Sequence, residues 1–174
     1  MSTPTRLSDR LVALWQHLGL GRAHVATQIP TDLADFAAHH AARIAGAVLC
    51  VPVRLDPAPF VALDDRLLMI AGDRGLTAEA TERAAARLPG ARRARLADYE
   101  ALGWSDVVAD RTEAVVAALL GHLGDRAADA PQAVPREGRH AGLTYRIEGS
   151  GPALVLLPFF LAPSQWQPAL PSIR

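Results

Sequence analysis

The chain has 174 residues, half of them apolar, which is enough to bury the core of one domain. Its 18 Lys and Arg balance its 18 Asp and Glu, so no global field attracts nucleic acid or an anionic membrane. The longest apolar stretches, around 44–53 and 152–162, are far shorter than the ~20 residues of a membrane-spanning helix, and residues 1–10 lack a signal-peptide core. We therefore expect a cytoplasmic protein that binds neither nucleic acid nor a membrane.

Helices and strands alternate from the start of the chain. Apolar residues at helical spacing predict a helix over 7–18, which the "GLG" at 19–21 ends. A short strand at 22–27 leads into a helix from about Asp32. Residues 46–53, "GAVLCVPV", are continuously apolar and predict a buried strand.

The same alternation continues to residue 124. We expect a buried strand at 66–72, a helix within 76–90 and a more exposed strand at 91–98. A last helix is expected at 110–124. The pattern is typical of an α/β fold with a mostly parallel sheet flanked by helices.

Short polar residues and glycines predict the ends of two of these helices. Thr77 is expected to be the N-cap of the third helix. Asp110, three residues before Glu113, suggests a variant of the capping box, and Gly90 and Gly124 stand where helices end.

Composition changes at 125–142, which contains few apolar residues and several Pro and Gly, and we interpret it as a linker. Beyond it, "LTYRI" and "ALVLLP" flank "EGSGP", which predicts two strands joined by a tight glycine turn. The sequence therefore suggests a segment at 1–124, a linker, and a second segment at 143–174.

Neither a metal site nor a cofactor is expected. Cys50 is the single cysteine, which excludes an internal disulfide and a cysteine-based zinc site. His39 and His40 are adjacent, so on a helix their side chains point about 100° apart and chelate poorly.

Three stretches resemble the α/β-hydrolase family. "GLGRAHVATQIPTDLADFAAHHAARIAGAVLCVPV" is similar to the family's nucleophile strand, elbow and following helix and strand. "LLMIAGDRGLTAEATERAAARLPGARRARLADYEALGWSDVVADRTEAVVAALLGHL" resembles the acid-bearing strand, histidine loop and last helix. "GLTYRIEGSGPALVLLPFFLAPSQWQPALP" resembles the opening hairpin, third strand and oxyanion loop.

The order of these stretches is rotated, because the family's first segment comes last. The resemblance implies a circularly rotated domain, or the join between two hydrolase-like units. The strand that normally follows the oxyanion loop would lie beyond Arg174, so we expect the chain to be incomplete.

Such rotated segments also resemble the N-terminal part of some bacterial proteins whose C-terminal part is a class I S-adenosylmethionine-dependent methyltransferase. No stretch resembles the glycine-rich loop for that cofactor. The expected partners are a downstream domain of the same protein or a second copy of the chain.

The hydrolase elbow, G-x-S-x-G, exposes its serine on a strained turn. Here the matching stretch is "TQIPT", where Ile29 stands in the serine position and Thr27 and Thr31 replace the glycines. Shifting the alignment by two residues places Thr27 in the nucleophile position. Thr27 is therefore a candidate nucleophile, with a turn hydroxyl or a helix cap as the alternatives.

The other catalytic positions are also changed. The resemblance places the acid at Gly75 of "GDRG", with Asp73 two residues earlier as the acid-like residue. In the histidine loop, Ser105 and Asp106 stand where a histidine is expected, so a hydroxyl nucleophile has no base.

The oxyanion-like loop carries Phe159 and Phe160 where family members commonly have a glycine. Two aromatic side chains favour an apolar ligand or partner surface, which Trp166 would extend. Ser164 is expected to cap the following helix.

The leading hypothesis is a catalytically silent hydrolase-like module that serves as a scaffold, interaction surface or small-molecule pocket. The first alternative is an active esterase-like hydrolase that uses Thr27 or Ser105 with Asp73. The second is an assembly domain that docks a partner through "PFFLAPSQW".

Overall fold

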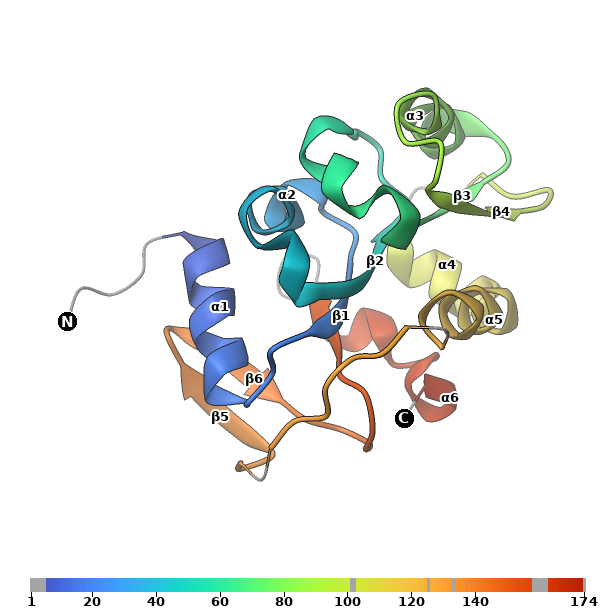
Figure 1. Cartoon of the computed structure of the whole chain (residues 1–174). Helices are drawn as coiled ribbons and strands as arrows, with labels where there is room; N and C mark the ends of the chain where they lie inside the picture. The colour runs from blue at the N-terminus through green and yellow to red at the C-terminus, as the bar shows by residue number, and fades with distance from the viewer. Residues whose placement is uncertain (1–5, 101–102, 125, 133, 158–162, 174) are drawn as a thin grey trace.

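A computed structural model describes residues 6–100, 103–124, 126–132, 134–157 and 163–173 (Figure 1). A parallel sheet forms its centre, with strand order β4-β3-β2-β1-β7. The strands are β1 (Ala23–Thr27), β2 (Ile44–Cys50), β3 (Leu67–Gly72), β4 (Arg92–Leu96) and β7 (Leu154–Leu157). The predicted α/β class with a parallel sheet flanked by helices is confirmed.

The helices lie between the strands in the chain, as the alternation predicted. The α-helices are α1 (Leu7–His17), α2 (Pro30–His40), α3 (Gly75–Ala85), α4 (Trp104–Asp110), α5 (Thr112–Leu123) and α6 (Leu170–Ile173). Short 3₁₀ segments are η1 (Ala41–Arg43), η2 (Ala58–Arg66) and η3 (Pro163–Trp166).

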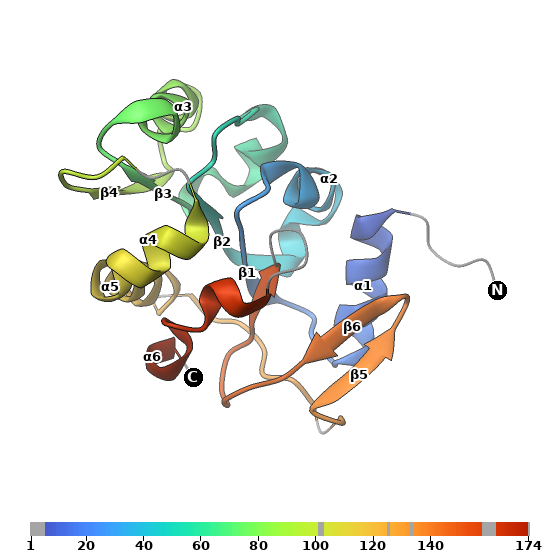
Figure 2. The ribbon, with the colours of Figure 1, turned by 180° about the vertical axis from the view of Figure 1, so that it is seen from behind.

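Each face of the sheet has its own hydrophobic core, because side chains alternate between faces along a strand. On one face, Val25, Leu49 and Met69 pack with residues of α1, α2, η2 and α3. On the other, Ala26, Val48 and Ile70 pack with α4, α5 and the segment 166–170. Figure 2 shows α4, α5 and α6 over this second face. The strands β1, β2 and β3 are buried throughout, which explains the continuous apolar sequences of β2 and β3.

The predicted hairpin between 143–147 and 153–158 is wrong. Residues Leu143–Arg146 form β6, which pairs antiparallel with β5 (Glu137–His140). Leu154–Leu157, in contrast, pairs parallel with β1 in the main sheet. The hairpin turn is Ala141–Gly142, and both residues have positive φ, 49° and 76°, as a two-residue type I′ turn requires.

The interpretation of 125–142 as a linker is wrong for 137–140, which belong to β5. The earlier part of 125–142 also forms backbone hydrogen bonds with the rest of the fold. The N–H of Asp129 donates to Arg22 O and Asp129 O accepts from Ala153 N, while Gln132 N donates to Leu18 O. The side chain of Asp129 accepts from Gly21 N and Arg22 N, both at 2.8 Å. We call 126–132 the crossing segment, since it runs past the amino end of β1 on its way from α5 to the hairpin.

Two predicted helix caps are wrong. Thr77 lies inside α3, which begins at Gly75 after Arg74 and has no side-chain cap. Likewise, α5 begins after Arg111 without a side-chain cap, and Asp110 instead accepts a hydrogen bond from the Tyr99 hydroxyl. The glycine at 124 does stand at the C-cap of α5.

Among the described residues, no helix combines the length and the apolar character that crossing a membrane requires.

Candidate functional site

The carboxyl end of β1 carries the elbow-like turn. Thr27, the last residue of β1, is fully buried, and its Oγ1 accepts a hydrogen bond from Ile29 N at 3.0 Å and lies 3.3 Å from Ile29 O. This is a local side-chain turn of the kind Ser and Thr commonly form. Its geometry matches the turn-hydroxyl alternative for Thr27.

The backbone of this turn differs from that of a strained elbow. Ile29 has φ −101° and ψ 100° and precedes Pro30, the first residue of α2. None of the described non-glycine residues with positive φ lies in the turn. Thr27 and Thr31, which stand at the glycine positions, and Ile29, which stands at the serine position, are all absent from the residues with positive φ.

A carboxylate that the sequence analysis did not single out lies in the first turn of α2. Asp32 is half-buried, and burial raises the pKa of its carboxyl above the ordinary value. Its position directly after the β1–α2 turn is the sequence signal that identifies it. No side-chain hydrogen bond joins it to Thr27 within the described part of the chain.

The acid-like residue Asp73 follows β3. Its carboxylate accepts from Asp98 N at 2.8 Å and Tyr99 N at 3.1 Å, and lies 3.6 Å from Arg74 Nε. The hydrogen bond from Asp98 N is the main reason why its pKa lies below the ordinary value. Asp73 thus holds the loop after β4, in which Asp98 has φ 52°.

The histidine-loop positions lie in the first turn of α4. Ser105 and Asp106 are both exposed, and Ser105 Oγ donates to Asp106 Oδ1 at 3.4 Å. No hydrogen bond in the described residues connects Thr27, Asp73 and Ser105 to one another. The structure therefore does not bring these three candidates together as a hydrogen-bonded set.

All six histidines lie away from this turn. His24 is the second residue of β1 and His122 the last but one of α5. His39 and His40 stand in the last turn of α2, which begins at the elbow-like turn and runs away from it. His17 and His140 stack on each other where α1 meets the hairpin, with ring centroids 4.3 Å apart. No imidazole contacts the hydroxyl of Thr27.

The oxyanion-like loop is described only in part. Phe159 and Phe160 lie outside the described residues. Ser164 is exposed within η3 and does not cap α6, which begins at Leu170. Trp166 is 2 % exposed and packs edge to face against Trp104, with centroids 5.0 Å apart. Trp166 is therefore part of the core on the second face of the sheet.

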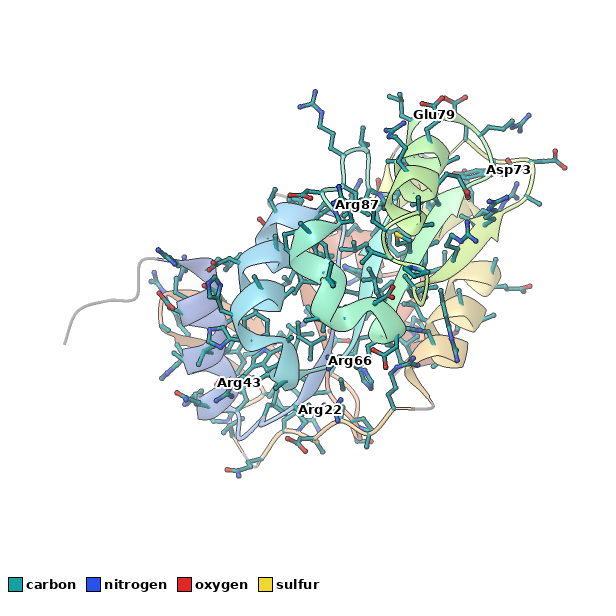
Figure 3. The ribbon with its side chains drawn as sticks, turned by 45° about the horizontal axis from the view of Figure 1, so that its top comes forward. Arg22, Arg43, Arg66, Asp73, Glu79 and Arg87 are labelled. Carbon is teal, nitrogen blue, oxygen red and sulfur yellow. The ribbon has the colours of Figure 1, made fainter. Side chains whose placement is uncertain are left out.

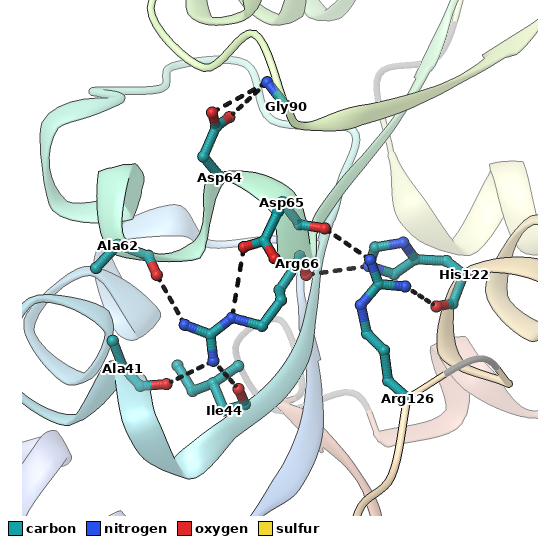
Figure 4. Close-up of polar contacts among 9 residues, drawn as sticks. All are labelled: Ala41, Ile44, Ala62, Asp64, Asp65, Arg66, Gly90, His122 and Arg126. Carbon is teal, nitrogen blue, oxygen red and sulfur yellow. Dashed lines mark hydrogen bonds and ion pairs between the residues drawn. The ribbon is translucent and has the colours of Figure 1, made fainter.

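The amino ends of the parallel strands, at the opposite edge of the sheet from the elbow-like turn, carry an arginine cluster. Arg66 Nη1 donates to Ala41 O and Ile44 O at 3.0 and 2.6 Å, and its Nη2 donates to Ala62 O at 2.7 Å (Figure 4). These carbonyls lie at the start of η1, at the start of β2 and in the middle of η2. The guanidinium of Arg66 thus joins η1, the start of β2 and its own η2 through backbone carbonyls, of which Ala41 O also accepts from Ile44 N.

Arg126 of the crossing segment makes a second junction at this edge. Its Nη1 donates to His122 O and its Nη2 to Asp65 O, both at 2.6 Å. His122 Nε2 lies 3.1 Å from Arg66 O and donates to it (Figure 4). Burial, followed by the charges of Arg126 and Arg92, lowers the pKa of His122 to about 4.

The described residues contain neither a group of metal ligands nor an accessible thiol. No group of three or more His, Cys, Asp or Glu is placed to hold a metal ion there. Cys50 is fully buried in β2, and burial raises the pKa of its thiol well above the ordinary value. A buried thiol of this kind has a structural role.

Comparison of the chain with protein-family models, curated proteins and solved structures finds no match.

Proposed function

We propose that this chain is a catalytically silent α/β-hydrolase-like module, with its segments in rotated order. It serves as a scaffold or binding part that works with a further domain of the same protein or with a second copy. The observation that carries this proposal is the state of Thr27, whose buried hydroxyl bonds to the backbone of Ile29.

The placement of strands supports the hydrolase-like part of the proposal. The oxyanion hole of that family takes one N–H from the residue after the nucleophile and one from the loop after the third strand. Here Leu157, the last residue of β7, pairs with Thr27. The elbow-like turn and the oxyanion-like loop thus begin at the same level on neighbouring strands.

The missing base supports the loss of catalysis. A hydroxyl nucleophile needs a proton acceptor within hydrogen-bond reach, normally an imidazole. The elbow-like turn has no histidine beside it, and Asp73 is engaged by Asp98 N and Tyr99 N. Loss of one triad member alone typically costs roughly four orders of magnitude in rate.

The rival function is an esterase-like hydrolase that uses Thr27 or Ser105. The observation that favours this rival is the exposed hydroxyl of Ser105, which lies beside the carboxylate of Asp106. This rival predicts covalent labelling of one hydroxyl by a fluorophosphonate probe.

The test measures turnover of activated p-nitrophenyl esters by the wild-type chain and by Thr27→Ala and Ser105→Ala. We expect no burst, no fluorophosphonate labelling, and the same background rate for all three proteins. An active serine hydrolase assayed in parallel controls for the reagents. A burst that disappears in either variant would overturn the proposal.

A further inference from the structure

Arginines stand at the start of four neighbouring strands. Arg22, Arg43 and Arg66 directly precede β1, β2 and β3, and Arg92 is the first residue of β4. Because these strands are parallel neighbours, the four residues come to one edge of the sheet. Figure 3 shows Arg22, Arg43 and Arg66 on one side of the molecule, away from Asp73 and Glu79.

A shallow cleft of about 420 Å³ lies among three of these arginines and Arg126 of the crossing segment. Its lining consists of Arg22, Arg66, Arg92, Arg126, Asp65 and two small residues, Ala45 and Ala127. The lining therefore contains four positive charges and one negative charge, in a chain whose formal net charge is zero. Arg43 stands at the same edge but does not line the cleft.

Three of the arginines donate to backbone carbonyls. Arg66 and Arg126 bind backbone carbonyls, and Arg92 Nη1 donates to Gly121 O at 3.1 Å. The one lining carboxylate, Asp65, lies 3.7 Å from Arg66 Nε. Asp129 is also close to Arg22, but its bonds are to the backbone N–H groups of Gly21 and Arg22. Carbonyls thus fix the guanidinium groups of Arg66 and Arg126 in place, and a carbonyl does not neutralise the charge of the group that donates to it.

Donor capacity remains for a ligand. A guanidinium has five N–H donors, and the bonds of Arg126 to His122 O and Asp65 O use two of them. The side chain of Arg22 is exposed and has no partner among the described residues. The positive charges also act on two buried histidines at this edge, His24 and His122. Burial is the main cause that lowers the pKa of both, and the charges of nearby arginines lower it further.

We propose that this cleft binds a phosphate dianion, either free or as the phosphomonoester of a small molecule, with Arg22 and Arg126 as donors and Arg66 and Arg92 supplying fixed charge. A compact dianion matches a cleft that several arginines from different elements line together. The cleft is open and its uncharged lining is limited to Ala45 and Ala127, so any organic part of the ligand lies in solvent. This site is at the opposite edge from the elbow-like turn and does not depend on the loss of catalysis.

The test is a titration of the whole chain with inorganic phosphate and with glycerol phosphate, followed by amide NMR shifts. Sodium chloride at matched ionic strength controls for screening. We expect saturable shifts at Ala45, Ala127 and Arg22. Tighter binding of glycerol phosphate identifies a phosphomonoester, and equal binding identifies the phosphate group alone.

Arg22→Ala and Arg43→Ala form a matched pair, since both remove an arginine that directly precedes a strand at this edge. We expect Arg22→Ala to weaken phosphate binding by about tenfold, the effect of losing one charge-assisted contact, and Arg43→Ala to leave it unchanged. Thermal unfolding without phosphate checks that both variants fold, and Arg22→Glu serves as a second variant in which binding should be lost.

Three results would overturn the assignment. The first is phosphate shifts no larger than those in chloride. The second is equal phosphate affinity in wild type and Arg22→Glu. The third is a single-stranded RNA that binds at this cleft far more tightly than either phosphate, which would identify a polyanion site instead.

Discussion

The side chain of Arg66 joins η1, β2 and η2. It binds carbonyls of Ala41, Ile44 and Ala62, while its own carbonyl accepts from His122. Its side chain is 19 % exposed, so these bonds are largely protected from water. Replacing it removes a donor from three carbonyls, of which Ala41 O also accepts from Ile44 N. Leaving a shielded carbonyl without a donor costs more than the bond itself contributes.

We therefore expect Arg66→Ala to lower the free energy of unfolding by roughly 2–4 kcal/mol. Arg87→Ala is the matched control, because Arg87 is exposed and has no side-chain partner in the described part of the chain, and it should change stability by less than about 0.5 kcal/mol. Urea unfolding measures both. Equal effects of the two variants would show that the Arg66 bonds add no net stability.

For the candidate site residues, the sequence shows which side chains are present, but it does not show which contacts they make. The absence of a serine at Ile29 and of a histidine near Ser105 is visible in the sequence. The bonds of Asp73 are not, because they depend on the positive φ of Asp98 in a loop 25 residues away. The arginine cluster did have a sequence signal, an arginine before successive strands, which becomes meaningful only once those strands are known to be parallel neighbours.

At the scale of elements, glycines and apolar periodicity predicted α1, β1, β2, β3 and β4 closely. The hairpin failed for a physical reason. The segments 143–147 and 153–158 both have strand-like sequences with glycines between them, and no local pattern shows whether they pair with each other or elsewhere. The true partner of β6 is the polar sequence "EGRH" of β5, which carries no hydrophobic signal.

The β5–β6 hairpin docks on α1 through its turn. Arg10 Nε donates to Ala141 O at 3.0 Å and Arg10 Nη2 to Gly142 O at 2.5 Å. Tyr145 OH lies 3.3 Å from His17 Nε2. The turn thus supports both the pairing of the strands and their attachment to the helix.

Substitutions at the two turn residues are predicted to change stability in opposite directions. Gly142→Ala should destabilise the protein by about 1–2 kcal/mol, since φ is +76° there and the new Cβ would lie 3.1 Å from Arg10 Nη2. Ala141→Gly should instead be neutral or stabilise by up to about 1 kcal/mol, because Ala141 already has φ 49°. Thermal unfolding compares them. A stabilising Gly142→Ala would contradict the turn geometry.

At the scale of the whole molecule, pH acts through the buried amino edge of the sheet. His122 is 1 % exposed and neutral in the fold, with a pKa of about 4 against an ordinary value of 6.5. The pKa of His24 is lowered in the same direction by burial. Between pH 6.5 and about 4, His122 is protonated in more of the unfolded chains than of the folded ones. The free energy of unfolding therefore falls as pH falls through this range.

We expect the free energy of unfolding to decrease between pH 6.5 and about 4, by roughly 2–3 kcal/mol from His122. His122→Gln keeps an N–H that can donate to Arg66 O but cannot be protonated, so it should flatten this dependence. Urea unfolding at a series of pH values measures both proteins. An unchanged slope in His122→Gln would exclude His122 as the source.

The strand β7 has a further consequence for how the molecule assembles. It pairs with β1 across more than 120 residues of intervening chain, with His24 matched to Leu154, whereas β1 through β4 follow one another in the sheet in the order of synthesis. Closure of a loop of that length is slow relative to local pairing. During translation the fully buried residues of β1 therefore belong to an open sheet edge until the last part of the described chain emerges, and this edge is where a folding intermediate would be exposed to wrong pairing.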